Sequence, residues 1–149
     1  MQALDPYLIF DGNCAEAMTY YAGVLGGQVE MLMTYGASPV ANQCTAASAE
    51  RVMHARVRFG ERSIMASDSP LEQPYEPMRS ISLALTYGTV EEAQRVYDAL
   101  REGGDVRMAM TPTFWAGAFA MLVDRFGTPW MINGALADLG QAAGQEQMS

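Results

Sequence analysis

The chain contains a single histidine, His54, and imidazole is the side chain best suited to take up and release a proton at neutral pH. The stretch 52–59 is expected to be a strand, but its neighbours do not decide which face His54 occupies. Two roles follow. The residue is either hydrogen-bonded within the sheet or at a dimer contact, or it acts as a general base or polar anchor at a cavity. We expect no metal-ligand role for it.

Other reactive groups are scattered. Cys14 and Cys44 lack CxxC spacing, so we expect two reduced thiols, with a disulfide as the alternative. Cys14 lies in the first turn of an expected helix, where a thiol pKa can be lowered, although simple packing is the plainer role. Asp68 is predicted to be a turn residue. Asp124 and Arg125 are predicted to pair at a strand end.

Composition favours a compact soluble domain. Half of the 149 residues are hydrophobic, yet no apolar run is long enough to cross a membrane. Nothing at the N-terminus suggests secretion, so a cytoplasmic location is expected. Nine basic and seventeen acidic residues give a net charge of -8, which repels nucleic acid and anionic lipid. A small molecule is the expected partner.

The chain repeats itself. The pattern Gly12, Glu16, Ala17, Tyr21 recurs as Gly88, Glu92, Ala93, Tyr97. Two units of half length are each too small to bury a core alone, so we expect them to pack as one domain with a site in the cleft between them.

Each half is predicted to be a strand, a helix and three further strands. In the first half Asn13 and Glu16 have the spacing of a capping box, and Gly26 ends the helix; in the second half Thr89 and Glu92 form the box. The strands predicted for the first half are 7–10, 28–35, 51–59 and 62–67. The last three strands predicted for the second half are 105–110, 119–125 and 130–133.

The domain organisation follows from these elements. We expect a single domain over 1–149, with module 1 at about 4–68, a Pro-rich linker at 69–79, module 2 at about 80–134 and a tail at 135–149 that contains a short helix. The segment 36–50 has no counterpart in module 2. A loop of that length is typically a lid or an arm that contacts a partner.

Two tandem βαβββ units resemble the vicinal oxygen chelate superfamily of glyoxalase I, bleomycin-resistance proteins and dioxygenases. Within it the chain is similar to the PhnB-like subgroup, through the stretches 6–14, 51–55, 65–68, 113–115 and 124–133. The resemblance implies an α+β fold whose two modules form a partly open, barrel-like cleft, and a homodimer. It also implies a divalent metal on the first and last strand of each module.

The residues at those metal positions are poor ligands. Alignment from the helix caps places Pro6, Met65, Ser82 and Met131 there, and none is a normal ligand for a hard metal ion. A shift of one residue would offer Asp5 or Tyr7 instead, still without a set of His and Glu. We therefore expect no metal and no cofactor. The methyltransferase label that some relatives carry is discounted, because the chain has no glycine-rich loop that would cradle a nucleoside cofactor.

Strand alternation then predicts a ligand surface. The candidate lining residues are Met65, Ser67, Ser82, Trp115, Trp130, Met131 and Asn133. Thioethers, aromatic rings and a few neutral polar groups suit a small apolar or aromatic molecule. Two hypotheses follow: a binding protein without a catalytic metal, or a lyase, isomerase or dioxygenase whose metal site is displaced or absent. Glyoxalase I activity is not expected. A purely structural role for the dimer is a third hypothesis.

Overall fold

The structure, a computed structural model, describes residues 1–138 and groups the chain into two compact units, unit 1 (Met1–Met78) and unit 2 (from Arg79 onward). The boundary falls inside the predicted linker. The predicted tail helix lies largely outside the described residues. No helix within 1–138 is long and apolar enough to cross a membrane.

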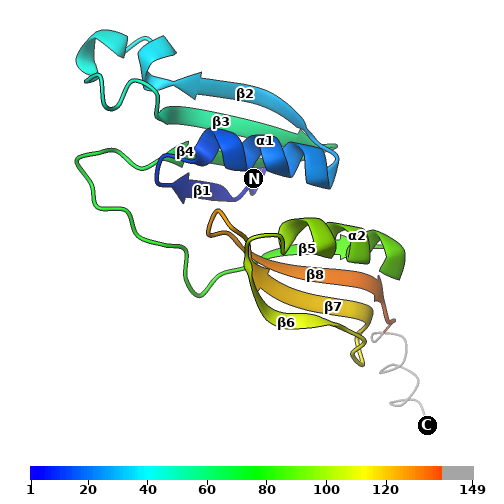
Figure 1. Cartoon of the computed structure of the whole chain (residues 1–149). Coiled ribbons are helices and arrows are strands. Elements are labelled where there is room, and N and C mark those ends of the chain that lie inside the picture. Colours follow the sequence, from blue (N-terminus) through cyan, green and yellow to red (C-terminus); the bar gives the residue numbers. More distant parts are fainter. Residues whose placement is uncertain (139–149) are drawn as a thin grey trace. The chain divides into compact units, whose positions relative to one another are not determined.

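Unit 1 has the predicted βαβββ order. It contains β1 (Tyr7–Phe10), α1 (Cys14–Leu25), β2 (Gln28–Thr34), β3 (Val52–Phe59) and β4 (Arg62–Asp68), with the short 3-10 turns η1 (Tyr35–Ala37) and η2 (Ala41–Gln43) between β2 and β3. The strands form sheet A in the order β1-β4-β3-β2, with β1 parallel to β4 and the other pairs antiparallel. One face of sheet A is covered by α1 (Figure 1).

Unit 2 has the same order of elements. It contains β5 (Leu83–Tyr87), α2 (Val90–Leu100), β6 (Asp105–Thr111), β7 (Ala116–Val123) and β8 (Pro129–Leu136). Sheet B has the order β5-β8-β7-β6, again with one parallel pair. The predicted α+β fold of two βαβββ modules is confirmed. The cleft predicted between the modules stays a prediction.

Each unit has its own core between its helix and its sheet, so the expectation that a unit of half length is too small to bury a core alone is wrong. In unit 1 the helix contributes Met18 and Tyr21, which are fully buried with Phe10 of β1. In unit 2 the helix contributes Val96 and Leu100, which are buried with the sheet residues Leu122, Trp130 and Ile132. Burial of these large side chains is the main stabilising term for each unit.

Strand β8 extends from Pro129 to Leu136, beyond the predicted range of 130–133. A Cβ on Gly134 would lie 2.7 Å from the Cβ of Ala93 and 2.9 Å from the Thr89 carbonyl oxygen. The glycine lets β8 pass directly beneath α2, and pairing with β7 continues to Leu136. The extra pairing also moves the start of β7 from the predicted Phe119 to Ala116.

The two helices start differently. Thr89 caps α2 as predicted, since its hydroxyl accepts a hydrogen bond from the Glu92 N–H at 3.2 Å. The capping box predicted for α1 is wrong: within residues 1–138 the Asn13 side chain accepts no capping hydrogen bond. Asp68, from the end of β4, takes over that task.

Candidate functional site

Most of the candidate site residues of unit 1 lie on the face of sheet A that is turned away from α1. We call it the open face of sheet A and define it by Tyr7, Ile9, Met31, Met33, His54, Arg56, Met65 and Ser67. Alternation along β1 shows the two sides, since Leu8 and Phe10 are buried whereas Tyr7 is 46% and Ile9 40% exposed.

The open face has a row of four side chains across the sheet. Tyr7 of β1 pairs with Met65 of β4, Met65 pairs with Arg56 of β3, and Arg56 pairs with Met31 of β2. Residues opposite each other on neighbouring strands have side chains in contact range. An aromatic ring, two thioethers and a guanidinium group therefore lie side by side.

His54 belongs to the same face. Its neighbours Ala55 and Val57 show the alternation, because both are fully buried on the α1 side whereas His54 and Arg56 point the other way. The Tyr7 hydroxyl lies 3.3 Å from Nδ1 of His54, and the two rings stack with their centroids 5.8 Å apart. The structure thus shows which face of the sheet His54 occupies, which the sequence alone did not decide. The pair presents a flat aromatic surface with polar edges.

Arg56 is incompletely satisfied. Its Nε is buried and has no hydrogen-bond partner among the described residues, and its nearest carboxylate oxygen, on Glu30, is 3.8 Å away. Glu30 makes the closer pair with Arg58, at 3.0 Å. The Nε–H is covered by protein atoms and faces Glu30, so it is not itself available to a ligand on the open face.

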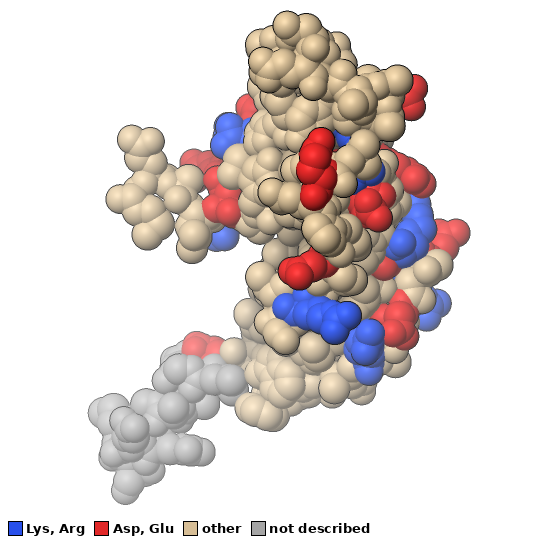
Figure 2. Space-filling model, turned by 90° about the vertical axis from the view of Figure 1, so that its left-hand side faces the viewer, with Lys and Arg blue, Asp and Glu red and all other residues tan. Residues whose placement is uncertain are grey.

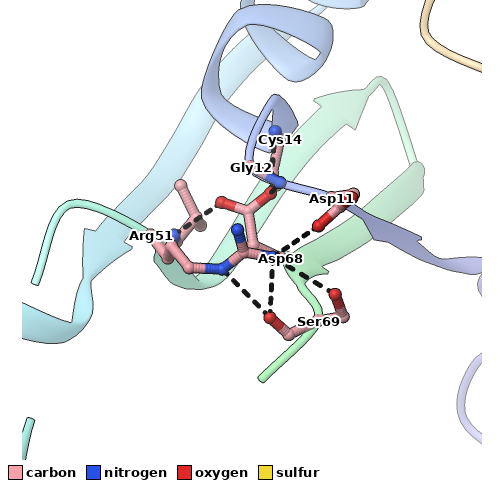
Figure 3. Close-up of polar contacts among 7 residues, drawn as sticks. Asp11, Gly12, Cys14, Arg51, Asp68 and Ser69 are labelled. Carbon is pink, nitrogen blue, oxygen red and sulfur yellow. Dashed lines mark hydrogen bonds and ion pairs between the residues drawn. The ribbon is translucent and has the colours of Figure 1, made fainter. Parts of the chain in front are cut away.

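Asp68, the last residue of β4, is buried on the side of sheet A that packs against α1. It is 1% exposed, and its Oδ1 accepts hydrogen bonds from the N–H groups of Gly12 at 2.8 Å and Cys14 at 3.0 Å, while Oδ2 accepts from the Val52 N–H at 2.8 Å (Figure 3). The carboxylate joins the start of α1 to the start of β3 and the end of β4. Asp68 is therefore a structural anchor, and its prediction as a turn residue is wrong. No sequence signal links it to Cys14.

Asp124 has a comparable role in unit 2. Its Oδ1 accepts hydrogen bonds from the N–H groups of Phe126 and Thr128, and its Oδ2 accepts from Nε1 of Trp130 at 2.8 Å. These bonds close the turn between β7 and β8. The carboxylate organises this turn in addition to any contact with Arg125.

The Cys14 thiol is not activated. Burial, with a smaller contribution from the negative charge of Asp68, raises its pKa to about 12. The thiol therefore stays protonated at neutral pH and is inert as a nucleophile. Packing, the simpler of the two roles considered for Cys14, is the one that the structure supports. Both Cys14 and Cys44 are free thiols.

The predicted lining residues divide between the two units. Met65 and Ser67 lie on the open face of sheet A. In unit 2, Met131 and Asn133 pair with Met121 and Phe119 of β7 on the face of sheet B away from α2, which we call the open face of sheet B.

Three further candidates belong to unit 2. Ser82 lies just ahead of β5, in step with Ala84, which pairs with Met131. Trp115 packs edge-on against Phe119, with ring centroids 5.1 Å apart. Trp130 points to the α2 side and is 1% exposed, so its indole is held in the core by Asp124 and is not part of the open face.

The metal positions given by the alignment from the helix caps are not the paired positions in either unit, since in unit 2 Ala84, not Ser82, pairs with Met131. In unit 1 Tyr7, not Pro6, pairs with Met65, and the Pro6 carbonyl accepts a hydrogen bond from the Met65 N–H at 3.0 Å. The connection to the helix spans 11–13 in unit 1 but only 88–89 in unit 2, so an alignment from the helix caps sets the first strands of the two units one residue out of step with each other.

The donor set at these positions does not fit a hard divalent metal. The paired positions hold a phenol, two thioethers and the methyl group of Ala84 in place of the His and Glu ligands that such ions prefer, and Ser82 ahead of β5 adds only a neutral hydroxyl. Within residues 1–138, no three His, Cys, Asp or Glu side chains come together as a group able to hold a metal ion. No step of a reaction is therefore assigned to a metal.

Comparison with known proteins agrees with this description. Residues 2–133 match the family described as 3-demethylubiquinone-9 3-methyltransferase. Protein YjdN of Escherichia coli (strain K12) is 36% identical over 138 residues, covering 87% of this chain and 93% of YjdN.

Two solved structures are also similar. The crystal structure of protein PA1353 from Pseudomonas aeruginosa has a TM-score of 0.82 at 43% identity, covering 89% of this chain and 98% of that one. A mutant of the fosfomycin resistance protein FosX from Listeria monocytogenes, in complex with Mn(II), has a TM-score of 0.63 at 9% identity, covering 95% of this chain and 98% of that one. The likeness to FosX concerns the fold alone.

Proposed function

This chain belongs to the PhnB-like family of the vicinal oxygen chelate superfamily, and we propose that it binds a small, largely apolar or aromatic molecule on the open face of sheet A without a catalytic metal. The observation that carries the proposal is the stacked pair of Tyr7 and His54. A half-exposed aromatic pair with a neighbouring thioether favours a flat ligand.

The contacts around the pair define the ligand further. Met65 and Met31 flank Arg56 across the sheet, so a bound ring would meet soft, adaptable side chains on both sides of the guanidinium. Ser67, 9% exposed, adds a neutral hydroxyl.

We propose the open face of sheet B as a second surface for ligand binding. Met131 and Asn133, with Ser82 at the start of β5, give it a similar mixture of thioether and neutral polar groups. We also propose a homodimer as the working unit, in line with the superfamily. Light scattering at micromolar concentration tests it, and a monomer would contradict it.

Methyl transfer is not proposed, although the family description names it. The strand-to-helix connections, 11–13 and 88–89, each contain a single glycine. Neither is the glycine-rich loop that brings backbone N–H groups against a nucleoside cofactor.

A metal-free lyase or isomerase is the second candidate. It is favoured by the contact between the Tyr7 hydroxyl and His54, because such a pair can pass a proton to or from a ligand on the same face. Substitution of His54 by Gln would then abolish turnover of a substrate while keeping its binding.

Indole, a flat neutral ring with one polar N–H, is a suitable probe for the binding proposal. Protein labelled at methionine methyl groups should show a saturable shift of the Met65 methyl signal, with a Kd of about 1 mM for so small a ligand. Met65→Trp should remove indole binding. Val106→Trp, on edge strand β6 of unit 2, is the matched control, since Val106 is 37% exposed and pairs with Leu122 on the α2 side of sheet B. Unchanged indole affinity in Met65→Trp, with the fold intact by circular dichroism, would contradict the proposal.

A further inference from the structure

Unit 1 contains a pocket that is separate from the open face of sheet A. It lies between the 35–51 segment and the start of the linker, and its volume is about 190 Å³. Tyr35, Val40 and Leu71 provide apolar surface, whereas Gln43, Arg51 and Glu72 provide polar groups. The predicted insertion thus forms one wall of a cavity.

Hydrogen bonds fix the wall formed by the insertion. The Tyr35 N–H donates to the Arg51 carbonyl at 3.0 Å, and the Gly36 N–H donates to the Ala49 carbonyl at 2.9 Å. A Cβ on Gly36 would lie 3.0 Å from that carbonyl oxygen, so the two ends of the segment approach closely. Backbone hydrogen bonds therefore join the two ends of the segment.

Arg51, at the C-terminal end of this segment, binds the linker wall. Its Nη2 donates to the Ser69 carbonyl at 2.8 Å and its Nε donates to the same oxygen at 3.1 Å, while Nη2 also lies 3.2 Å from Oδ1 of Asp11 (Figure 3). The Arg51 side chain is only 14% exposed. Arg51 therefore joins the two walls, since its backbone carbonyl binds the insertion and its guanidinium group binds the linker.

The charges around the pocket leave one carboxylate without a partner. Residues 36–49 contain no Lys, Arg, Asp or Glu, and this uncharged segment is seen as the tan surface at the top of Figure 2. The Arg51 donors are directed at Ser69 and Asp11. Among the described residues, Glu72 makes no hydrogen bond or ion pair. An incoming ligand therefore meets an unpaired negative charge.

We propose that this pocket binds a small organic cation, a single-ring amine whose ammonium group pairs with Glu72 and whose ring packs against Tyr35 and Leu71. The size fits, because a cavity of about 150 Å³ holds a benzene ring and drug-sized ligands need about 300 Å³ or more. An aromatic ring and a carboxylate together are the groups that recognise organic ammonium ions.

The experiment compares three probes of equal size: benzylamine, benzyl alcohol and benzoate. Each is titrated into the full chain, and binding is followed by amide shifts of residues 35–51 and 70–72 and by protection of Cys44 from iodoacetamide. Cys44 lines the pocket, whereas Cys14 is fully buried and serves as an internal unreactive thiol. Benzylamine is expected to give saturable shifts and to slow Cys44 alkylation, with the alcohol weaker and benzoate inactive.

A conservative pair of variants isolates the charge. Glu72→Gln keeps the shape and should weaken benzylamine about fivefold, as expected for a partly exposed ion pair. Glu76→Gln, on the same linker but outside the pocket lining, should leave the affinity unchanged. Equal or tighter binding of benzoate, an affinity for benzylamine that Glu72→Gln does not change, or no saturable shift up to about 20 mM would overturn the proposal.

Discussion

The carboxylate of Asp68 accepts a hydrogen bond of 3.0 Å from the backbone N–H of Cys14, a residue 54 positions earlier in the sequence. Through this bond the last residue of β4 caps the first turn of α1, a task that usually falls to a residue just before the helix. Since β4 also carries Met65 and Ser67, the same strand fixes the helix on one face of sheet A and contributes to the candidate site on the other.

Asp68→Asn is expected to destabilise unit 1 by about 1–3 kcal/mol, because an amide cannot accept all three N–H groups and leaves at least one buried donor unpaired. Urea unfolding measures the effect. Asp11→Asn is the control, since the Asp11 side chain is 60% exposed and its pair with Arg51 contributes little. Equal stability of the two variants would show that the Asp68 cap is unimportant.

Gly134→Ala should also destabilise the protein, since the new Cβ would lie 2.7 Å from the Cβ of Ala93, with backbone atoms of α2 close by. Gly23→Ala should do the opposite. Gly23 lies in α1 with nothing within 4 Å of its Cβ position, so Ala is expected to stabilise the helix by about 0.5–1 kcal/mol. Thermal unfolding of both variants tests the pair, and a neutral Gly134→Ala would contradict the close packing of β8 under α2.

The stability of unit 1 should fall with alkaline pH through Cys14. The pKa of the Cys14 thiol is about 12 in the folded protein, whereas the ordinary value, which applies to the unfolded chain, is 9.0. As the pH rises, the unfolded chain therefore loses the thiol proton first. The stabilising contribution is complete below pH 9 and decreases as the pH rises toward 12.

The Cys14→Ala variant tests this effect, because it lacks the thiol. Wild type should lose more stability than Cys14→Ala between pH 8 and about pH 10.5 in urea titrations. Parallel pH curves for the two proteins would mean that the Cys14 thiol ionises as easily in the folded chain as in the unfolded one.

The element order was predictable from the sequence because it depends on local signals. Gly26 takes a left-handed conformation with φ of 74° and ends α1, and Thr89 caps α2. The misjudged features depend on contacts between distant residues. The cap of α1 comes from Asp68, and the length of β8 depends on the distance between Gly134 and Ala93.

The site was predictable in part for a similar reason. Period-two alternation puts Met131 and Asn133 on one face, but the predicted lining also includes Trp130, although the same alternation places it on the opposite side from its neighbour Met131. The facing of His54 required the burial of Ala55, which only packing against α1 reveals. The alignment from the helix caps set the first strands of the two units one residue out of step, because the connection to the helix is one residue longer in unit 1.

Purified protein is expected to carry no stoichiometric transition metal, because the paired positions Tyr7, Met65, Ala84 and Met131, with Ser82 nearby, offer no His or carboxylate ligands. Elemental analysis measures this directly. Added Mn(II) should likewise leave the unfolding temperature unchanged, since a metal bound to the native state would raise it. One equivalent of zinc, nickel, iron or manganese that survives dialysis would favour the enzyme hypothesis.

The most direct test of the proposed function is the position of a bound flat ring on unit 1. In the complex of the full chain with indole, nuclear Overhauser contacts are expected from indole protons to the rings of Tyr7 and His54 and to the Met65 methyl group. Contacts confined to residues away from the open face of sheet A, or none at saturating indole, would contradict the account.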